Sequence, residues 1–139
     1  MKIPINIRVY GNIKFRGKCP KETIEQITFV SWVRRTYPDT HGLTLFHAKN
    51  EKKRKGAEFV ELDKDKAMGF VKGCSDIHDH GKPSLCMEIK RQDHTQSTID
   101  DDQVSYLLAA QKNHAFVCIA LGHEAAIEAF NDWRILNKC

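Results

Sequence analysis

The sequence predicts an α/β fold in which helices pack on the faces of a β-sheet. Three observations predict it. Segments with apolar residues at helical spacing alternate along the chain with short segments whose apolar residues alternate or run continuously. Two strand-like segments flank a turn rich in Gly and Pro. A length of 139 residues, 41% hydrophobic and 29% charged, suits one domain over residues 1–139 with a single core.

The first half of the chain predicts a helix, a short strand and a weaker helix. Over residues 20–37 apolar side chains recur at every third position, and Pro38 ends the pattern. Residues 43–47 are expected to form a short strand. A weaker helical pattern covers residues 59–68, with Gly69 as its C-terminal stop.

A hairpin is predicted in the middle of the chain. Residues 75–78 and 84–91 have the composition of strands, and residues 79–83 have that of the turn between them. Because side chains alternate across a strand, the second strand presents two different faces. One face would carry Leu85, Met87 and Ile89, and the other Cys86, Glu88 and Lys90.

The last third of the chain predicts a helix, a buried strand and a final helix. Asp100–Asp102 supply an N-cap and an acidic first turn for a helix that runs to about Gln111. The continuous apolar run 115–120 is typical of a buried strand. A final helix reaches about Leu136, with Ile127, Phe130 and Trp133 on its inner face.

The positive charge is concentrated in one stretch. The net charge is +4, and residues 49–55 carry five positive charges and one negative charge, which leaves 17 of each sign elsewhere. A concentrated basic segment can bind backbone phosphates beside an active site. The alternative is a solvated loop.

The cysteines and the hydropathy of the chain indicate the cellular compartment. The five cysteines are odd in number and form no Cys-x-x-Cys motif, which indicates a reducing cytoplasm. Neither a membrane span nor a secretory signal is recognisable. A zinc site built from His78, His80, Cys74 and Cys86 lacks any standard ligand spacing, so polar turn chemistry, with incidental DNA contact, is the preferred interpretation for the histidines.

Asp76, Glu88 and Lys90 form the sharpest chemical pattern. Two carboxylates that converge from paired strands can hold a hard cation such as Mg²⁺, which lowers the pKa of bound water and offsets charge on a phosphoryl group. Lys90, on the same strand face as Glu88, can orient water or stabilise a phosphorane-like transition state. The alternative is an exposed polar strand face with Asp76 in a turn.

These residues resemble a nuclease family. Gly73-Cys74-Ser75-Asp76 and Met87-Glu88-Ile89-Lys90 resemble the metal-binding core of the PD-(D/E)XK nucleases. More narrowly, residues of about 20–135 resemble the virus-type replication-repair nuclease (VRR-NUC) domain. The resemblance is to a stand-alone member of the phage type. That narrower resemblance also rests on Glu25, Gln26, Trp32, Pro38, the segment 50–54 and Gln103.

The resemblance implies a restriction-endonuclease-like core, with a central mixed β-sheet flanked by helices. It implies that Asp76 and Glu88 bind the metal ion, with the backbone carbonyl of Ile89 as a further ligand. Lys90 would be the catalytic lysine. The ion would be Mg²⁺, and Mn²⁺ would substitute for it.

The resemblance also assigns roles to two helical residues and contains one departure. Glu25 would complete the site as a ligand through water or as a proton acceptor, and Gln103 would brace the site from the following helix. From periodicity alone, both would be solvated surface residues. Ser75 stands where the family usually has proline, a position that shapes the backbone rather than supplying chemistry.

The expected activity is Mg²⁺-dependent hydrolysis of DNA phosphodiester bonds by an endonuclease selective for DNA shape, as in a Holliday-junction resolvase of DNA recombination and repair. Symmetric junction cleavage needs two sites, so a homodimer is expected, acting in the host cytoplasm if phage-encoded. A flap- or end-acting nuclease, a restriction-like enzyme and a catalytically silent DNA-binding protein are the alternatives. The expected DNA-binding residues are Lys49, Asn50, Lys52, Lys53, Arg54, Lys55, Lys72 and Arg91.

Overall fold

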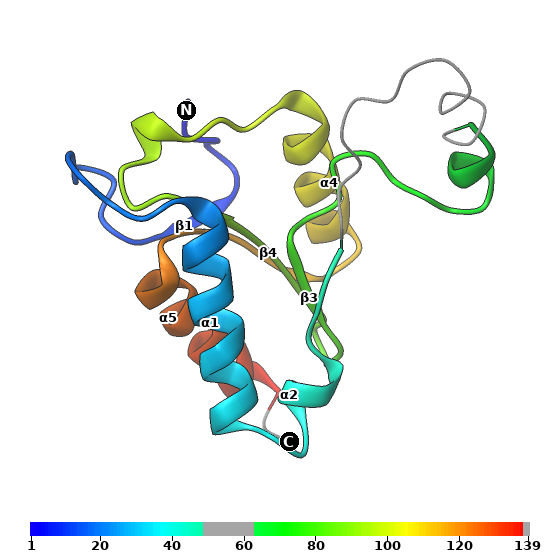
Figure 1. Ribbon diagram of the computed structural model, residues 1–139. Coiled ribbons are helices and arrows are strands. Elements are labelled where there is room, and N and C mark those ends of the chain that lie inside the picture. The colour runs from blue at the N-terminus through cyan, green and yellow to red at the C-terminus, as the bar shows by residue number, and fades with distance from the viewer. Residues whose placement is uncertain (49–62, 138–139) are drawn as a thin grey trace.

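A five-stranded mixed sheet is the centre of the molecule. The computed structural model describes residues 1–48 and 63–137 (Figure 1). The strands are β1 Arg8–Tyr10, β2 Phe46–His47, β3 Ile77–Asp79, β4 Leu85–Lys90 and β5 Phe116–Leu121. Their order in the sheet is β1-β5-β4-β3-β2. β1, β5 and β4 run parallel, whereas β3 is antiparallel to β4 and β2 is antiparallel to β3.

Helices cover both faces of the sheet, as the sequence predicts. They are α1 Glu22–Thr36, α2 His41–Thr44, the 3-10 helix η1 His94–Gln96, α4 Asp101–Lys112 and α5 His123–Leu136, and residues 63–67 are also helical. α1 and α5 pack together on one face, and α4 packs against β5 on the other (Figure 1). Within the described residues, no helix combines the length and apolar character that a membrane crossing requires.

β4 has two different faces, and the predicted alternation of its side chains is confirmed. Leu85, Met87 and Ile89 belong to the larger apolar cluster under α1 and α5. Cys86 belongs to a smaller cluster on the α4 side. β4 is nevertheless buried along its whole length, so the alternative of an exposed polar strand face at Glu88 is wrong. Helices on both sides of the sheet are the physical reason.

The other predicted elements lie close to their expected positions. α1 occupies most of residues 20–37, and β3 and β4 form the predicted antiparallel hairpin, although Asp79 of the predicted turn belongs to β3. Asp100 is the N-cap of α4, and its side chain accepts a hydrogen bond from the backbone N–H of Gln103. Phe130 and Trp133 of α5 are fully buried, which confirms the predicted inner face.

Four details of the sequence prediction need correction or lie partly outside the structure. In the predicted strand 43–47, residues up to Thr44 belong to α2, because the Thr44 hydroxyl and His41 both hydrogen-bond Asp79 and fold the segment back. β1 and η1 were not predicted, since each is only three residues long. Of the predicted helix 59–68, residues 59–62 lie outside the described residues.

Candidate active site

The hairpin register brings two carboxylates together. Ile77 of β3 is paired with Met87 of β4, so Asp76 and Glu88 form the next position along the antiparallel ladder. Asp76 Oδ2 accepts a hydrogen bond from the Ile89 backbone N–H at 3.1 Å. The Asp76 carboxylate is close enough to Glu88 to raise the pKa of Glu88. Residues twelve positions apart in the sequence therefore form one acidic site.

Glu88 is a buried acid without a complete set of partners. Its relative exposure is 1%. Burial raises the pKa of Glu88 above its ordinary value, and the neighbouring charge of Asp76 raises it further, while Lys90 opposes both. Among the described residues, Glu88 Oε2 is buried and has no hydrogen-bond donor. A buried carboxylate in this position needs either a proton or a cation.

Lys90 lies on the same face of β4 and is almost fully buried. Its Nζ is 3.5 Å from Glu88 Oε1 and donates a hydrogen bond to the Thr98 carbonyl oxygen at 2.6 Å. Thr98 belongs to the segment between η1 and α4. This contact fixes the ammonium group beside the paired carboxylates instead of leaving it to range through solvent.

Gln103 connects the acidic site to the start of α4. Its Nε2 donates to Glu88 Oε1 at 2.8 Å, and its Oε1 accepts from the Asp100 backbone N–H at 3.0 Å. The bond between Gln103 Oε1 and the Asp100 N–H, together with the N-cap bond of Asp100, forms a capping box. One side chain therefore both closes the helix start and orients Glu88.

The segment that carries Asp76 is held by residues whose positioning role the sequence did not reveal. Ser75 is fully buried, and its hydroxyl is 3.0 Å from His78 Nε2, which is also 2.9 Å from the Tyr106 hydroxyl of α4. On the other side, the ring of His47 bonds the Asp76 carbonyl oxygen at 2.8 Å. The signal for His78 was its place beside Asp76, but its link to Tyr106 depends on tertiary contact.

Gly73 shows why the glycine of the motif is needed. Its φ is +80°, a conformation that favours glycine. A Cβ at this position would lie 2.5 Å from the carbonyl carbon of Asp102. The segment leading to Asp76 can therefore approach the first turn of α4 closely only with glycine here.

The donors at this site fit a hard divalent cation. Asp76 and Glu88 supply carboxylate oxygens, which Mg²⁺ prefers, and Mg²⁺ commonly takes its other ligands from water, backbone carbonyls or substrate. The buried, donor-free Oε2 of Glu88 is the atom that such an ion would satisfy. No cluster of three or more His, Cys, Asp or Glu side chains suited to an ion occurs within residues 1–48 and 63–137.

Glu25 is buried, but its partners belong to another part of the molecule. It lies on α1, and its Oε2 accepts a hydrogen bond from the His123 backbone N–H at 2.5 Å. Its Oε1 is 3.4 Å from His123 Nδ1 and 3.5 Å from Gln92 Nε2. The carboxylate therefore satisfies the start of α5, where the helix dipole favours negative charge. These contacts do not join Glu25 to Asp76 or Glu88.

The predicted DNA-binding residues do not share one environment in the structure. Lys72 is exposed and forms an ion pair with Asp102 at 3.1 Å. Arg91 donates from Nη2 to the Cys19 carbonyl oxygen at 2.8 Å, so its guanidinium ties β4 to the N-terminal loop. The predicted residues between Lys49 and Lys55 lie outside the described part of the chain.

Comparison with known proteins supports the predicted fold. No family model matches the sequence, and no curated protein matches it. Among solved structures, a chain described as a "VRR_NUC domain protein" superposes with a TM-score of 0.64. The match has 19% sequence identity and covers 89% of this chain and 94% of the other. This likeness agrees with the predicted VRR-NUC resemblance and with a restriction-endonuclease-like core.

Proposed function

We propose that the chain is a Mg²⁺-dependent DNA endonuclease that hydrolyses phosphodiester bonds, with a preference for branched DNA such as a four-way junction. The observation that carries the proposal is the environment of Glu88. A carboxylate that is 1% exposed lies beside a second carboxylate and a buried lysine, and one of its oxygens has no donor among the described residues. Such an arrangement is costly for a purely structural role.

The metal ion would be held by Asp76 and Glu88, with the Ile89 carbonyl oxygen as the further expected ligand. When bound, Mg²⁺ lowers the pKa of a coordinated water and offsets negative charge on the phosphate. Mn²⁺ is expected to substitute for it. The remaining chemistry belongs to the side chains around the ion.

Lys90 and Gln103 would divide the work beside the two carboxylates. The Thr98 carbonyl holds the Lys90 ammonium in place, which still has hydrogens to offer an attacking water or a phosphate oxygen. Gln103 fixes the orientation of Glu88 through its 2.8 Å hydrogen bond. Glu25 acts at a distance, by holding the start of α5 against α1.

A preference for DNA shape is proposed because, within the described residues, helices α1, α4 and α5 pack against the sheet or one another instead of forming a separate base-reading element. Direct reading of bases needs an element that enters a groove, whereas recognition of shape can depend on backbone contacts. Cleavage of both arms of a junction requires two active sites, so the proposed enzyme acts as a homodimer. Sedimentation of the protein with and without a junction measures this directly.

The proposal is tested by cleavage of three synthetic substrates of related sequence: a four-way junction, a flap and a linear duplex. Wild type, Glu88→Gln and the control Glu128→Gln are compared with Mg²⁺, with Mn²⁺ and with EDTA. Glu128 is an exposed residue of α5, so the control removes the same charge away from the site. We expect Glu88→Gln to reduce cleavage by about 10²- to 10⁴-fold and the control to retain it.

Each outcome distinguishes one version of the function. Cleavage of the junction in preference to the duplex supports the proposal, and cleavage of flaps or ends supports a different nuclease of the same fold. Cleavage that survives Glu88→Gln would rule out this site. DNA binding by the wild type without cleavage under either metal would favour a silent binding protein.

A further inference from the structure

The N-terminal loop between β1 and α1 is a second basic segment of the chain. Residues 11–21 contain four cationic side chains and no acidic one. These four side chains are Lys14, Arg16, Lys18 and Lys21, and all are exposed. In the described part of the chain, none of the four forms an ion pair with a carboxylate. The Arg16 guanidinium donates to the carbonyl oxygens of Ile13 and Phe15 within the loop.

The backbone of this loop is fixed although its cationic side chains are exposed. The Gly17 backbone N–H donates to Asp93 Oδ2 at 3.0 Å, and Gln96 Nε2 donates to the Gly17 carbonyl oxygen at 2.8 Å. Arg91 donates to the Cys19 carbonyl oxygen at 2.8 Å. Hydrogen bonds from the Thr95 hydroxyl and the Gly17 N–H hold the pKa of Asp93 well below its usual value, so this anchor is ionised at neutral pH.

The anchors place the loop beside the candidate active site. Arg91 directly follows Lys90, and Asp93 and Gln96 lie in the short segment between β4 and α4. The segment continues to Thr98, whose carbonyl oxygen holds the Lys90 ammonium. Residues 91–100, which connect β4 to α4, therefore hold both the basic loop and the proposed catalytic lysine.

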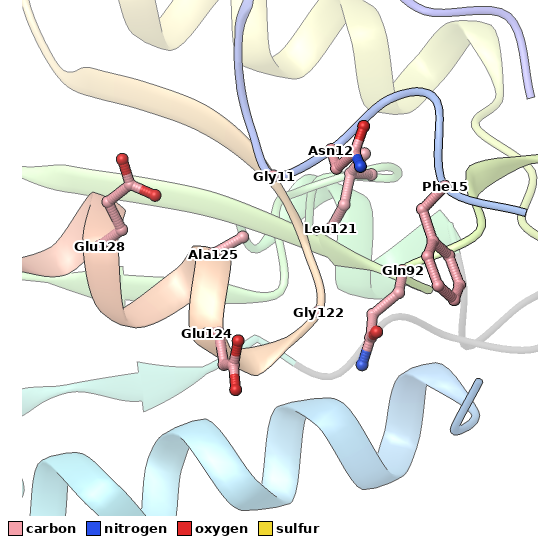
Figure 2. Close-up of a pocket in the computed structure, with 9 residues that line it drawn as sticks. All are labelled: Gly11, Asn12, Phe15, Gln92, Leu121, Gly122, Glu124, Ala125 and Glu128. Carbon is pink, nitrogen blue, oxygen red and sulfur yellow. The ribbon is translucent and has the colours of Figure 1, made fainter.

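Apart from Asp93, which the loop backbone contacts, acidic groups near the loop line the pocket at its base. This pocket is lined by Asn12 and Phe15 of the loop, by Gln92 and by Glu124 and Glu128 of α5. Figure 2 shows Glu128 and Glu124 on the α5 side and Phe15 on the opposite side, from which the loop continues away from α5.

We infer that Lys14, Arg16, Lys18 and Lys21 form a docking surface for the sugar-phosphate backbone of nucleic acid, next to the proposed cleavage site. The inference rests on the proposed function, because it concerns how the same substrate is held. A rigid loop that presents several cations loses little entropy when it binds phosphates. Exposed Lys and Arg side chains suit contacts with phosphate oxygens, which position nucleic acid without reading its sequence.

The test compares two triple variants that lose the same charge from opposite ends of the sheet. The loop variant is Lys14→Gln, Arg16→Gln, Lys18→Gln. The control is Arg35→Gln, Lys82→Gln, Lys112→Gln, whose residues are exposed at the end of the sheet that carries the β3–β4 turn. Binding of a junction and of a duplex is measured with EDTA, so that no cleavage occurs, at several salt concentrations.

We expect the loop variant to bind DNA roughly 10- to 100-fold more weakly than wild type at moderate salt. The slope of log affinity against log salt is negative, and each lost phosphate contact makes it shallower by about 0.9. Loss of three contacts should therefore reduce its magnitude by up to about 3. The control should change the slope by less than about 1. With Mg²⁺, the loop variant should raise KM and keep kcat, and thermal unfolding checks that both variants are folded.

The results separate the two proposals. If wild type binds and cleaves DNA but the loop variant behaves as the control does, the docking surface is refuted and the proposed function stands. If wild type binds no DNA of either shape, both proposals fall. A loss of kcat without a rise in KM would also refute the docking role.

Discussion

Two neighbouring residues of β4, Met87 and Glu88, are equally inaccessible and have opposite surroundings. Met87 is fully buried among the aromatic and aliphatic side chains under α1 and α5. Glu88 points to the α4 side, where its partners are charged or polar. Burial alone therefore does not distinguish the core from the site.

The difference lies in what burial does to the free energy of unfolding. An apolar side chain gains from leaving water, by about 1.5–3 kcal/mol for a side chain of this size. A carboxylate loses unless every oxygen is paired, and Glu88 Oε2 has no donor among the described residues. One face of the strand stabilises the fold, while the other carries a cost that only a proton or a cation relieves.

Met87→Ala should show the largest effect on stability. The cavity left in the apolar cluster is expected to lower the free energy of unfolding by about 2–5 kcal/mol. Urea unfolding followed by circular dichroism measures the loss. Junction cleavage per folded molecule should stay near the wild-type value, and a large fall in kcat at full folding would show that the two faces are not independent.

Glu88→Gln should act in the opposite direction on stability when no metal is present. Because the pKa of Glu88 is raised in the folded state, that state keeps a proton which the unfolded chain releases above its ordinary pKa of 4.5. Between pH 4.5 and the raised pKa of Glu88, the folded state binds more protons than the unfolded chain. The free energy of unfolding of wild type therefore falls as pH rises through this range. Glutamine removes the titration and should stabilise the protein by on the order of 2 kcal/mol near neutral pH.

The measurement is thermal unfolding of wild type, Glu88→Gln and Glu128→Gln in EDTA at about pH 5 and about pH 8. The difference between wild type and Glu88→Gln should grow with pH, and Glu128→Gln should follow wild type. Addition of Mg²⁺ should raise the melting temperature of wild type and leave that of Glu88→Gln nearly unchanged. Parallel curves at both pH values would contradict the buried-acid assignment.

Gln103→Met should weaken metal binding through Glu88 without removing a ligand. The substitution keeps the length of the side chain but loses the hydrogen bond to Glu88 Oε1. Loss of a group that orients a ligand typically costs 10- to 100-fold in metal affinity, so an effect of about tenfold is expected. Mn²⁺ titration by calorimetry measures it, and an unchanged affinity would assign Gln103 to helix capping alone.

Asp100→Ala is the matched control for that experiment and should have the smallest effect. It removes the N-cap bond of α4 but leaves the Gln103 side chain opposite Glu88. We expect a loss of about 1 kcal/mol in the free energy of unfolding and little change in Mn²⁺ affinity. If Asp100→Ala weakens Mn²⁺ binding as strongly as Gln103→Met does, helix capping and positioning of Glu88 are inseparable.

Local patterns were enough to predict most of the fold. The three-residue apolar spacing of α1, the alternation along β4 and the Asp100 cap of α4 each depend on interactions within one element or between neighbours in the chain. β1 was missed because three residues of a parallel edge strand have too short a pattern, and its partner β5 is more than a hundred residues away. The pattern of residues 43–47 predicts a strand, but residues up to Thr44 belong to α2. The hydrogen bond that Thr44 donates to Asp79 joins residues far apart in the chain, so no local pattern reveals it.

For the site, the sequence by itself determined which groups lie together on the hairpin. Alternation placed Glu88 and Lys90 on one face of β4, and the hairpin pattern placed Asp76 on the neighbouring strand. The register that sets Asp76 opposite Glu88 came from the structure. Only the tertiary structure decided that α4 covers this face, that Gln103 reaches Glu88, and that Glu25 serves the start of α5. The physical reason is that periodicity specifies the direction of a side chain, whereas its desolvation and its partners depend on which other element packs against it.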